Sequence, residues 1–175
     1  RAVVMAIHLL NTLFLLGGMT MCAWWATDTH PIDLQSPRRR SLLIGVGLFF
    51  TVGITGAIAA LGDTLFPASS LLEGIAADLD PASHFLLKLR TLHPVVALLC
   101  AGWLWSLATR WPSRPGRWLK GLLAMQVLAG FANLALLAPG WLQLVHLLLA
   151  DLAWVVFLIF GAVSLRPHTT APSSG

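Results

Sequence analysis

Charged side chains are scarce in this sequence: they make up 10% of the 175 residues, whereas hydrophobic residues make up 57%. A soluble domain carries about 25% charged residues, so the composition argues against a soluble globular domain. Tyrosine is absent, while tryptophan occurs eight times, several times near the ends of apolar runs, where indole rings anchor membrane helices. The net charge of +4 is small. We expect contact with membrane lipid and no nucleic-acid partner.

Cysteine is also scarce. Cys22 and Cys100 both lie inside apolar runs without metal-ligand spacing, so we predict that they are small buried hydrophobic residues. The first apolar run ends in WWATDTHP rather than in a small-residue cleavage site, which argues against a signal peptide. The chain opens at Arg1 without a methionine and is apolar almost at once. We therefore expect it to be part of a longer protein.

Five apolar runs dominate the chain. Each is close to the ~20 residues that a helix needs to cross ~30 Å of hydrocarbon, and all five should be helical because lipid cannot satisfy open backbone groups. The predicted helices cover about residues 2–25, 41–61, 84–108, 118–137 and 141–165. The sequence predicts an all-α, polytopic membrane protein with a helical region over 1–168 and a disordered tail over 169–175.

Basic residues occur in alternate connections between these runs. Arg38–Arg40 follow the first run, Arg110, Arg114 and Arg117 follow the third, and Arg166 follows the fifth. The intervening connections carry acidic residues or no charge. Because Lys and Arg accumulate on the cytoplasmic (or matrix) side of a membrane, the pattern predicts that the chain enters from outside and that its C-terminus is cytoplasmic.

Three histidines lie inside the apolar runs. At 1.5 Å per residue, His8, His93 and His146 fall within roughly 7–14 Å of the outer helix ends, which predicts one layer of imidazoles. A single intramembrane histidine can be a neutral ring hydrogen-bonded to a neighbouring helix, or a ligand of heme iron, zinc or copper. Three at one depth favour ligation. Zinc would need further ligands that are not visible, whereas two facing histidines suit the axial positions of a heme.

The stretch ASHFLLKLRTLHPVVALL leads into the third predicted helix. Arg90 lies one turn before His93 on the same face, toward the outer surface, where it would meet a propionate of a heme held by His93. The alternative for Arg90, and for Lys88, is that the side chain reaches lipid headgroups. Pro94 should loosen a backbone hydrogen bond in the first turns. Asp151, the only acid inside a span, has two readings: a polar contact with another helix, or a proton relay.

Small and polar residues mark two further helix faces. The second predicted helix is rich in glycine, and Gly53 and Gly56 indicate close helix packing or room beside a flat cofactor. Gln126 and Asn133 are seven residues apart in the fourth predicted helix, so they share a face. We expect them to join that helix to a neighbour.

Four strings resemble successive parts of the heme A synthase family: AIHLLNTLFLL, TGAIAALGDTLFP, HFLLKLRTLHPVVALL and QVLAGFANLALLAPGWLQLVHLLLADLAWVVF. The resemblance covers almost the whole chain, up to Leu165. That family has eight membrane helices in two similar four-helix halves, each with a histidine pair on its second and fourth helices. The resemblance implies that this chain corresponds to helices four to eight, and that residues 41–165 form an antiparallel four-helix bundle that holds heme.

The resemblance also implies roles for the histidines. His93 and His146 match the pair that ligates a b-type heme in the family. His8 matches one histidine of the site where heme O is oxidised, whose second histidine and nearby glutamate have no match in this chain. The outer-loop cysteine pairs of the family have no match either, since residues 63–83 contain no cysteine. This chain alone is therefore expected to lack part of the catalytic site.

The implied activity is oxidation of the ring methyl of heme O to a formyl group, which makes heme A for cytochrome oxidase in a bacterial plasma membrane. Heme b would be a cofactor, heme O the substrate, and heme O synthase and an electron donor the partners; a homo-oligomer stays open. The residues alone leave two other functions open. One is a membrane b-type cytochrome that transfers electrons without modifying heme, and the other is a non-catalytic scaffold or transporter.

Overall fold

The computed structural model describes residues 2–28 and 30–167, and within these ranges it contains helices and no strands. The helices are α1 (Ala2–Thr27), α2 (Arg38–Leu65), α3 (Leu71–Leu79), α4 (Phe85–Arg90), α5 (Leu92–Arg110), α6 (Arg114–Ala135) and α7 (Gly140–Ser164). Five stretches are long and apolar enough to cross a membrane, and one of them, Phe85–Arg110, combines α4 and α5. The predicted all-α chain with five transmembrane helices is confirmed.

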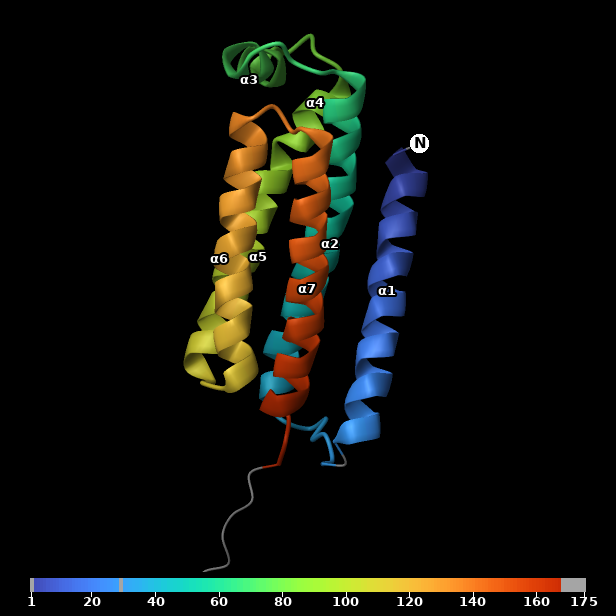
Figure 1. Ribbon diagram of the computed structural model, residues 1–175, viewed down its shortest axis with the longest axis vertical. Coiled ribbons are helices and arrows are strands. Elements are labelled where there is room, and N and C mark those ends of the chain that lie inside the picture. Colours follow the sequence, from blue (N-terminus) through green and yellow to red (C-terminus); the bar gives the residue numbers. More distant parts are fainter. Residues whose placement is uncertain (1, 29, 168–175) are drawn as a thin grey trace, which may run out of the picture.

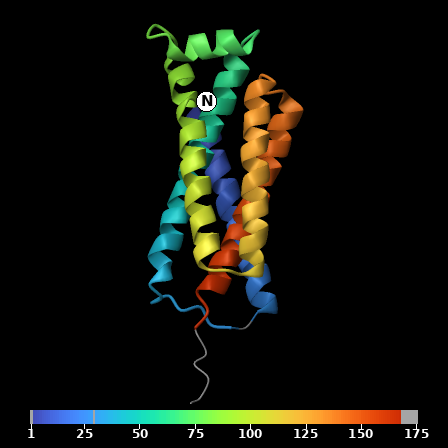
Figure 2. The same cartoon turned by 90° about the vertical axis from the view of Figure 1, so that its left-hand side faces the viewer.

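Helices α2, α5, α6 and α7 form an antiparallel bundle in which each packs against its neighbours in the ring (Figure 1). Helix α1 stands outside the bundle, against α2 and α7. The short helix α3 lies across one end of the bundle (Figure 2). Helices α5 and α7 therefore occupy opposite corners of the ring, so side chains that project inward from them face each other.

The tightest packing lies in the half of the bundle away from α3. The largest fully buried side chains are Phe157, Phe160, Leu104, Leu107 and Leu119. This part also secures α1, because the indole nitrogen of Trp154 donates a hydrogen bond of 2.9 Å to the carbonyl of Leu13. Close packing of large apolar side chains is what holds helices together in lipid.

The third predicted helix is broken. Helix α4 ends at Arg90, α5 begins at Leu92, and the Thr91 amide bonds the carbonyl of Leu89 instead of continuing the α-helical pattern. The cause is Pro94, which lacks the N–H that would bond the carbonyl of Arg90 four residues earlier. The predicted loosening is confirmed: a single residue, Thr91, divides the membrane span Phe85–Arg110 into α4 and α5.

Helix α6 begins earlier than the predicted residue 118. The side chain of Ser113 accepts a hydrogen bond from the Gly116 amide at 3.2 Å, and Pro115 stands in the first turn. Both features start helices. Arg114 and Arg117 were expected in a loop because charge interrupts the apolar run, but they belong to the first turns of α6.

Helix α3 was not predicted at all. It begins after Ser70, whose side chain accepts a hydrogen bond from the Glu73 amide at 3.2 Å. Its nine residues were too few and too mixed in character for a membrane span, so we expected a loop. The tail predicted for residues 169–175 lies outside the described residues.

Candidate functional site

The imidazole rings of His93 and His146 face each other in the half of the bundle next to α3. Their ring centroids are 6.5 Å apart and their planes are at 84°. His93 comes from α5 and His146 from α7, and both are half-buried. If one nitrogen of each ring bound the same metal ion at a metal–nitrogen distance of ~2 Å, the two ring centroids would be separated by about this distance. Two of the three histidines expected in one layer therefore lie together.

His93 receives its orientation from Thr55 of α2. The Thr55 hydroxyl lies 3.2 Å from Nδ1 of His93, and it also donates to the carbonyl of Thr51 at 3.0 Å. With its hydrogen used in that way, the hydroxyl oxygen can accept a hydrogen bond from the N–H at Nδ1. This tautomer leaves Nε2 of His93 with a free lone pair, which is the usual arrangement in a metal-binding histidine.

His146 lies against a polar stretch of α6. Its Nε2 is 3.2 Å from the side-chain nitrogen of Gln126, and the side-chain nitrogen of Asn133 is 3.5 Å from the carbonyl of Leu142. The prediction that Gln126 and Asn133 join α6 to a neighbour is confirmed, and the neighbour is α7. Nδ1 of His146, Oε1 of Gln126 and Oδ1 of Asn133 are buried without a partner among the described residues. Such atoms carry a desolvation cost that a further polar or metal partner would offset.

A glycine lies beside each imidazole. A Cβ atom on Gly56 would lie 3.0 Å from Cε1 of His93, and one on Gly130 would lie 3.3 Å from Cε1 of His146. Each ring thus contacts the backbone of the adjacent helix in space that any side chain would fill. Gly56 was expected to allow close helix packing or to make room beside a cofactor; it makes room for the imidazole of His93.

These residues fit a heme. The described residues contain no group of three or more His, Cys, Asp or Glu side chains placed to hold a metal ion, so a metal between the rings would have two protein ligands. Heme takes its two axial ligands from protein. Thr55 leaves Nε2 of His93 free, and the Gln126 amide would have to release Nε2 of His146. Thr55 and Gln126 were not predicted to belong to the site. Thr55 directly precedes Gly56, and Gln126 lies one helical turn before Gly130.

Arg90 lies at the end of the bundle covered by α3. Its guanidinium donates to Asp78 at 2.6 Å, to Asp63 at 3.1 Å and to the carbonyl of Gly74 at 3.3 Å. Only 12% of its side chain is exposed. Arg90 therefore joins α4 to α3 and to the end of α2. A propionate would share this guanidinium with two carboxylates, and that contact stays a prediction.

His8 and Asp151 lie elsewhere. The side chain of His8 is exposed on α1, and the structure does not bring it to the His93–His146 pair. Asp151 is half-buried, and its Oδ1 has no hydrogen-bond partner among the residues that the structure describes. The polar contact expected for Asp151 is thus absent from the described part of the chain, and the role of His8 stays a prediction.

Comparisons with known proteins identify the family of this chain. The family model COX15-CtaA, described as cytochrome oxidase assembly protein, matches residues 1–158. Two curated proteins from two strains of Thermus thermophilus, each called protoheme IX farnesyltransferase, are 41% identical to this chain over 178 residues. Each alignment covers 95% of this chain but 29% of the relative, so the chain spans about three-tenths of the length of these relatives. No solved structure matches it. The chain belongs to the cytochrome oxidase assembly family that contains the heme A synthases.

Proposed function

We propose that this chain is the C-terminal part of a heme A synthase and that its four-helix bundle binds heme b between His93 and His146. The observation that carries the proposal is the pair of facing imidazoles, 6.5 Å apart, in a member of this family. His93 belongs to α5 and His146 to α7, so the two rings could hold a heme iron from opposite corners of the bundle. Heme supplies one-electron chemistry when bound.

The protein residues would have distinct tasks. His93 and His146 would hold the heme iron through ring nitrogens, and Thr55 would hold the His93 ring in the tautomer that leaves Nε2 free. Gly56 and Gly130 keep the backbones of α2 and α6 close to the imidazoles, so the rings cannot turn without meeting a helix. These groups position and tune the porphyrin, while the redox change belongs to the iron.

The finer reaction that we propose is oxidation of the ring methyl of heme O to a formyl group. His8 would face or ligate this substrate on the exposed side of α1, and Arg90 would bind a propionate of the heme held by His93. Because His8 has no second histidine within reach among the described residues, the substrate site needs groups from outside this chain. Converting a methyl to a formyl group removes electrons from the substrate, so the reaction would need an oxidant. With dioxygen as that oxidant and as the source of the formyl oxygen, an electron donor would be a further partner.

We further propose that a heme O synthase delivers the substrate. In the two Thermus thermophilus relatives, which are named protoheme IX farnesyltransferases, the segment similar to this chain accounts for 29% of the sequence. A segment of this kind therefore occurs within proteins that act on protoheme IX. The predicted location is a bacterial plasma membrane with the C-terminus on the cytoplasmic side.

A second function has support from one observation. The two proposed ligands of heme b both lie within this chain, whereas the site proposed for heme O does not. A membrane b-type cytochrome that transfers electrons without modifying heme would need only the first site.

Heme extraction separates these functions. The protein is purified in detergent from cells that also make heme O synthase, and the extracted hemes are identified by chromatography and mass spectrometry. We expect heme b together with heme O or heme A. Heme b alone would favour the cytochrome, and the absence of Soret absorbance would refute both functions.

The ligand assignment has its own test. His93→Ala and His146→Ala should each abolish the low-spin absorption and electron paramagnetic resonance signals of a heme with two imidazole ligands. His84→Ala is the matched control, because His84 sits at the start of α4 and accepts a hydrogen bond from the Leu86 amide at 3.3 Å, away from the paired rings. Circular dichroism checks that each variant keeps its helices. An unchanged heme spectrum in either ligand variant would overturn the assignment.

A further inference from the structure

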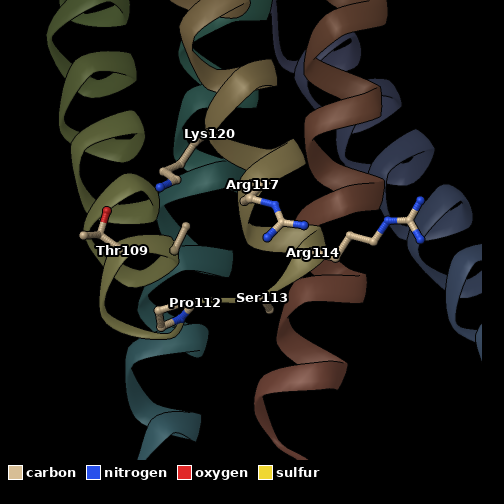
Figure 3. Close-up of a pocket in the computed structure, with 7 residues that line it drawn as sticks. Thr109, Pro112, Ser113, Arg114, Arg117 and Lys120 are labelled. Atoms are coloured by element: carbon tan, nitrogen blue, oxygen red, sulfur yellow. The ribbon is translucent and has the colours of Figure 1, made fainter.

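A separate pocket lies at the end of the bundle opposite to α3, where α5 turns into α6. It has a volume of about 310 Å³, and its polar lining comes from Thr109, Ser113, Arg114, Arg117 and Lys120. In Figure 3 the Lys120 side chain extends toward α5, where Thr109 lies, while the Arg114 side chain extends to the opposite side of α6. Three cationic residues thus line one small pocket, and the guanidinium of one of them, Arg114, is directed away from Lys120 (Figure 3).

These cations lack protein counter-charges. Arg114 and Arg117 have no hydrogen bond or ion pair within the described part of the chain, and the Lys120 ammonium lies over the Trp105 ring, 5.7 Å from its centroid. No acidic residue occurs between Asp80 and Asp151. Within the described residues, no carboxylate forms an ion pair with any of these three side chains.

Three other basic residues at this end of the bundle have protein partners. Arg38 donates to the carbonyl of Ser164 at 3.1 Å, Arg39 donates to a carbonyl at 3.1 Å, and Arg166 pairs with Asp28. The accumulation of basic residues on one side of the membrane accounts for all of them. It accounts equally for Arg40 and Arg110, which have no partner among the described residues; what distinguishes Arg114, Arg117 and Lys120 is that they line one pocket.

The position of these cations adds to the electrostatic repulsion that they experience. They lie in the first turns of α6, where free backbone N–H groups and the helix dipole already make the surroundings positive. The Ser113 hydroxyl oxygen accepts from the Gly116 amide, which leaves the hydroxyl hydrogen available to a ligand. A bound anion would offset the repulsion and accept that hydrogen.

The surroundings indicate which anion fits. Trp105 lies beneath the Lys120 ammonium, and Trp118 follows Arg117 in the chain; 46% and 63% of their surfaces are exposed. Exposed indoles are typical of the headgroup level of a membrane. The pocket stands at the end of two membrane-spanning helices, at the depth where lipid phosphates lie. We propose that it binds the phosphate of an anionic phospholipid from the leaflet on this side, through Arg117, Lys120 and Ser113, with Arg114 adding positive potential.

Lipid titration of the full chain in mild detergent, followed by native mass spectrometry, tests this proposal. The wild-type protein should bind phosphatidylglycerol at least about ten-fold more tightly than phosphatidylcholine. A basic residue near a membrane surface contributes roughly five-fold to the binding of anionic lipid. Arg117→Gln combined with Lys120→Gln should therefore weaken phosphatidylglycerol binding by about 25-fold and leave phosphatidylcholine binding unchanged.

Matched variants separate a specific site from general charge. Arg39→Gln combined with Arg40→Gln removes the same charge at the same end of the bundle and should keep the lipid preference, and Arg117→Lys should restore most of the affinity that Arg117→Gln loses. Equal binding of the two lipids, or equal loss in the control pair, would overturn the proposal. Displacement of phosphatidylglycerol by millimolar inorganic phosphate would identify a site for free phosphate and would also overturn it.

Discussion

The two halves of the four-helix bundle use the same kind of helix for different purposes. In the half next to the α5–α6 turn, which we call the packed half, Leu104, Leu107 and Phe157 fill the space between helices. We call the half next to α3 the histidine half. In it, the half-buried imidazoles of His93 and His146 lie between the helices instead. Glycines lie close to inward-facing side chains in both halves, but in the packed half Gly45 admits Leu104 and Phe157, whereas in the histidine half Gly56 admits His93.

The packed half therefore stabilises the fold, whereas the histidine half is suited to binding a ligand. Close apolar contact in the packed half holds the helices together in lipid. The histidine half contains buried polar atoms without partners, which makes it less favourable on its own. A ligand that binds between the rings would stabilise the folded state by mass action. Substitutions in the two halves should therefore separate thermal stability from heme affinity.

The largest effect on stability is expected for Gly45→Ala in the packed half. The new Cβ would lie 2.8 Å from Cζ of Phe157 and 2.9 Å from Cδ2 of Leu104, and overpacking of this kind costs about 1–3 kcal/mol. The melting temperature in detergent should fall, and the heme spectrum of the folded fraction should not change. Gly47→Ala is the control on the same helix, since nothing lies within 4 Å of its Cβ position. Equal melting temperatures for the two variants would contradict the assigned packing.

The next effect should appear in heme affinity. Thr55→Val removes the hydroxyl that lies 3.2 Å from Nδ1 of His93, and loss of a partner that orients a metal-binding histidine typically costs about ten-fold or more in metal affinity. Titration of the apoprotein with heme b, followed by Soret absorbance, should show that loss. Thr55→Ser keeps the hydroxyl and should bind nearly as well as wild type. A Thr55→Val variant with wild-type affinity would remove Thr55 from the site.

A smaller change in heme affinity is expected for Gly130→Ala. Its Cβ would lie 3.3 Å from Cε1 of His146, so the ring must shift by a few tenths of an ångström, at a cost near the lower end of the ~1–3 kcal/mol for overpacking. Heme binding should weaken by a few-fold. Gly121→Ala in the same helix meets nothing within 4 Å and should have no effect. If both variants bound heme equally, the close contact with His146 would be unimportant.

The smallest effect concerns the rim of the histidine half. Hydrogen bonds from the side chain and backbone of Ser69 hold the pKa of Glu73 below its ordinary value. A depressed pKa in the folded state gives stability that is present above the unfolded pKa of ~4.3 and is lost as the pH falls through the folded pKa. Hydrogen exchange, corrected for its intrinsic pH dependence, should show the start of α3 loosening in acid. Glu73→Gln should remove this pH dependence, and a variant that kept it would assign the transition to another group.

Much of the fold could be predicted because lipid imposes strict limits on length and hydropathy. The break before α5 was predictable from Pro94 alone. The start of α6 was not recognised because arginines lower the local hydropathy, although Ser113 and Pro115 are readable starting signals. Helix α3 has a readable starting signal in Ser70 and Glu73, whereas its contact with α4 through the pairing of Arg90 with Asp78 joins residues that no local pattern links.

The depth of the site histidines along their helices was predictable from the sequence, but the side of each helix that faces the bundle was not. Counting residues placed His93 and His146 at one level, and the rings do lie together. Which side of each helix faces the bundle depends on packing over the whole chain. For that reason the contacts of Thr55 and Gln126 could not be read from spacing, and the exposure of His8 followed only from the position of α1.

The partners of the two histidines have a consequence for the order of assembly. His93 contacts Thr55 within the α2–α5 pair, 38 residues apart, and His146 contacts Gln126 within the α6–α7 hairpin, 20 residues apart. Each hairpin can therefore orient its own imidazole before the two hairpins meet, since contacts that are closer in sequence form at a lower entropic cost. Docking of the hairpins is then the step that brings the rings together. A heme present at that moment would act as a template that joins two half-sites already shaped to receive it.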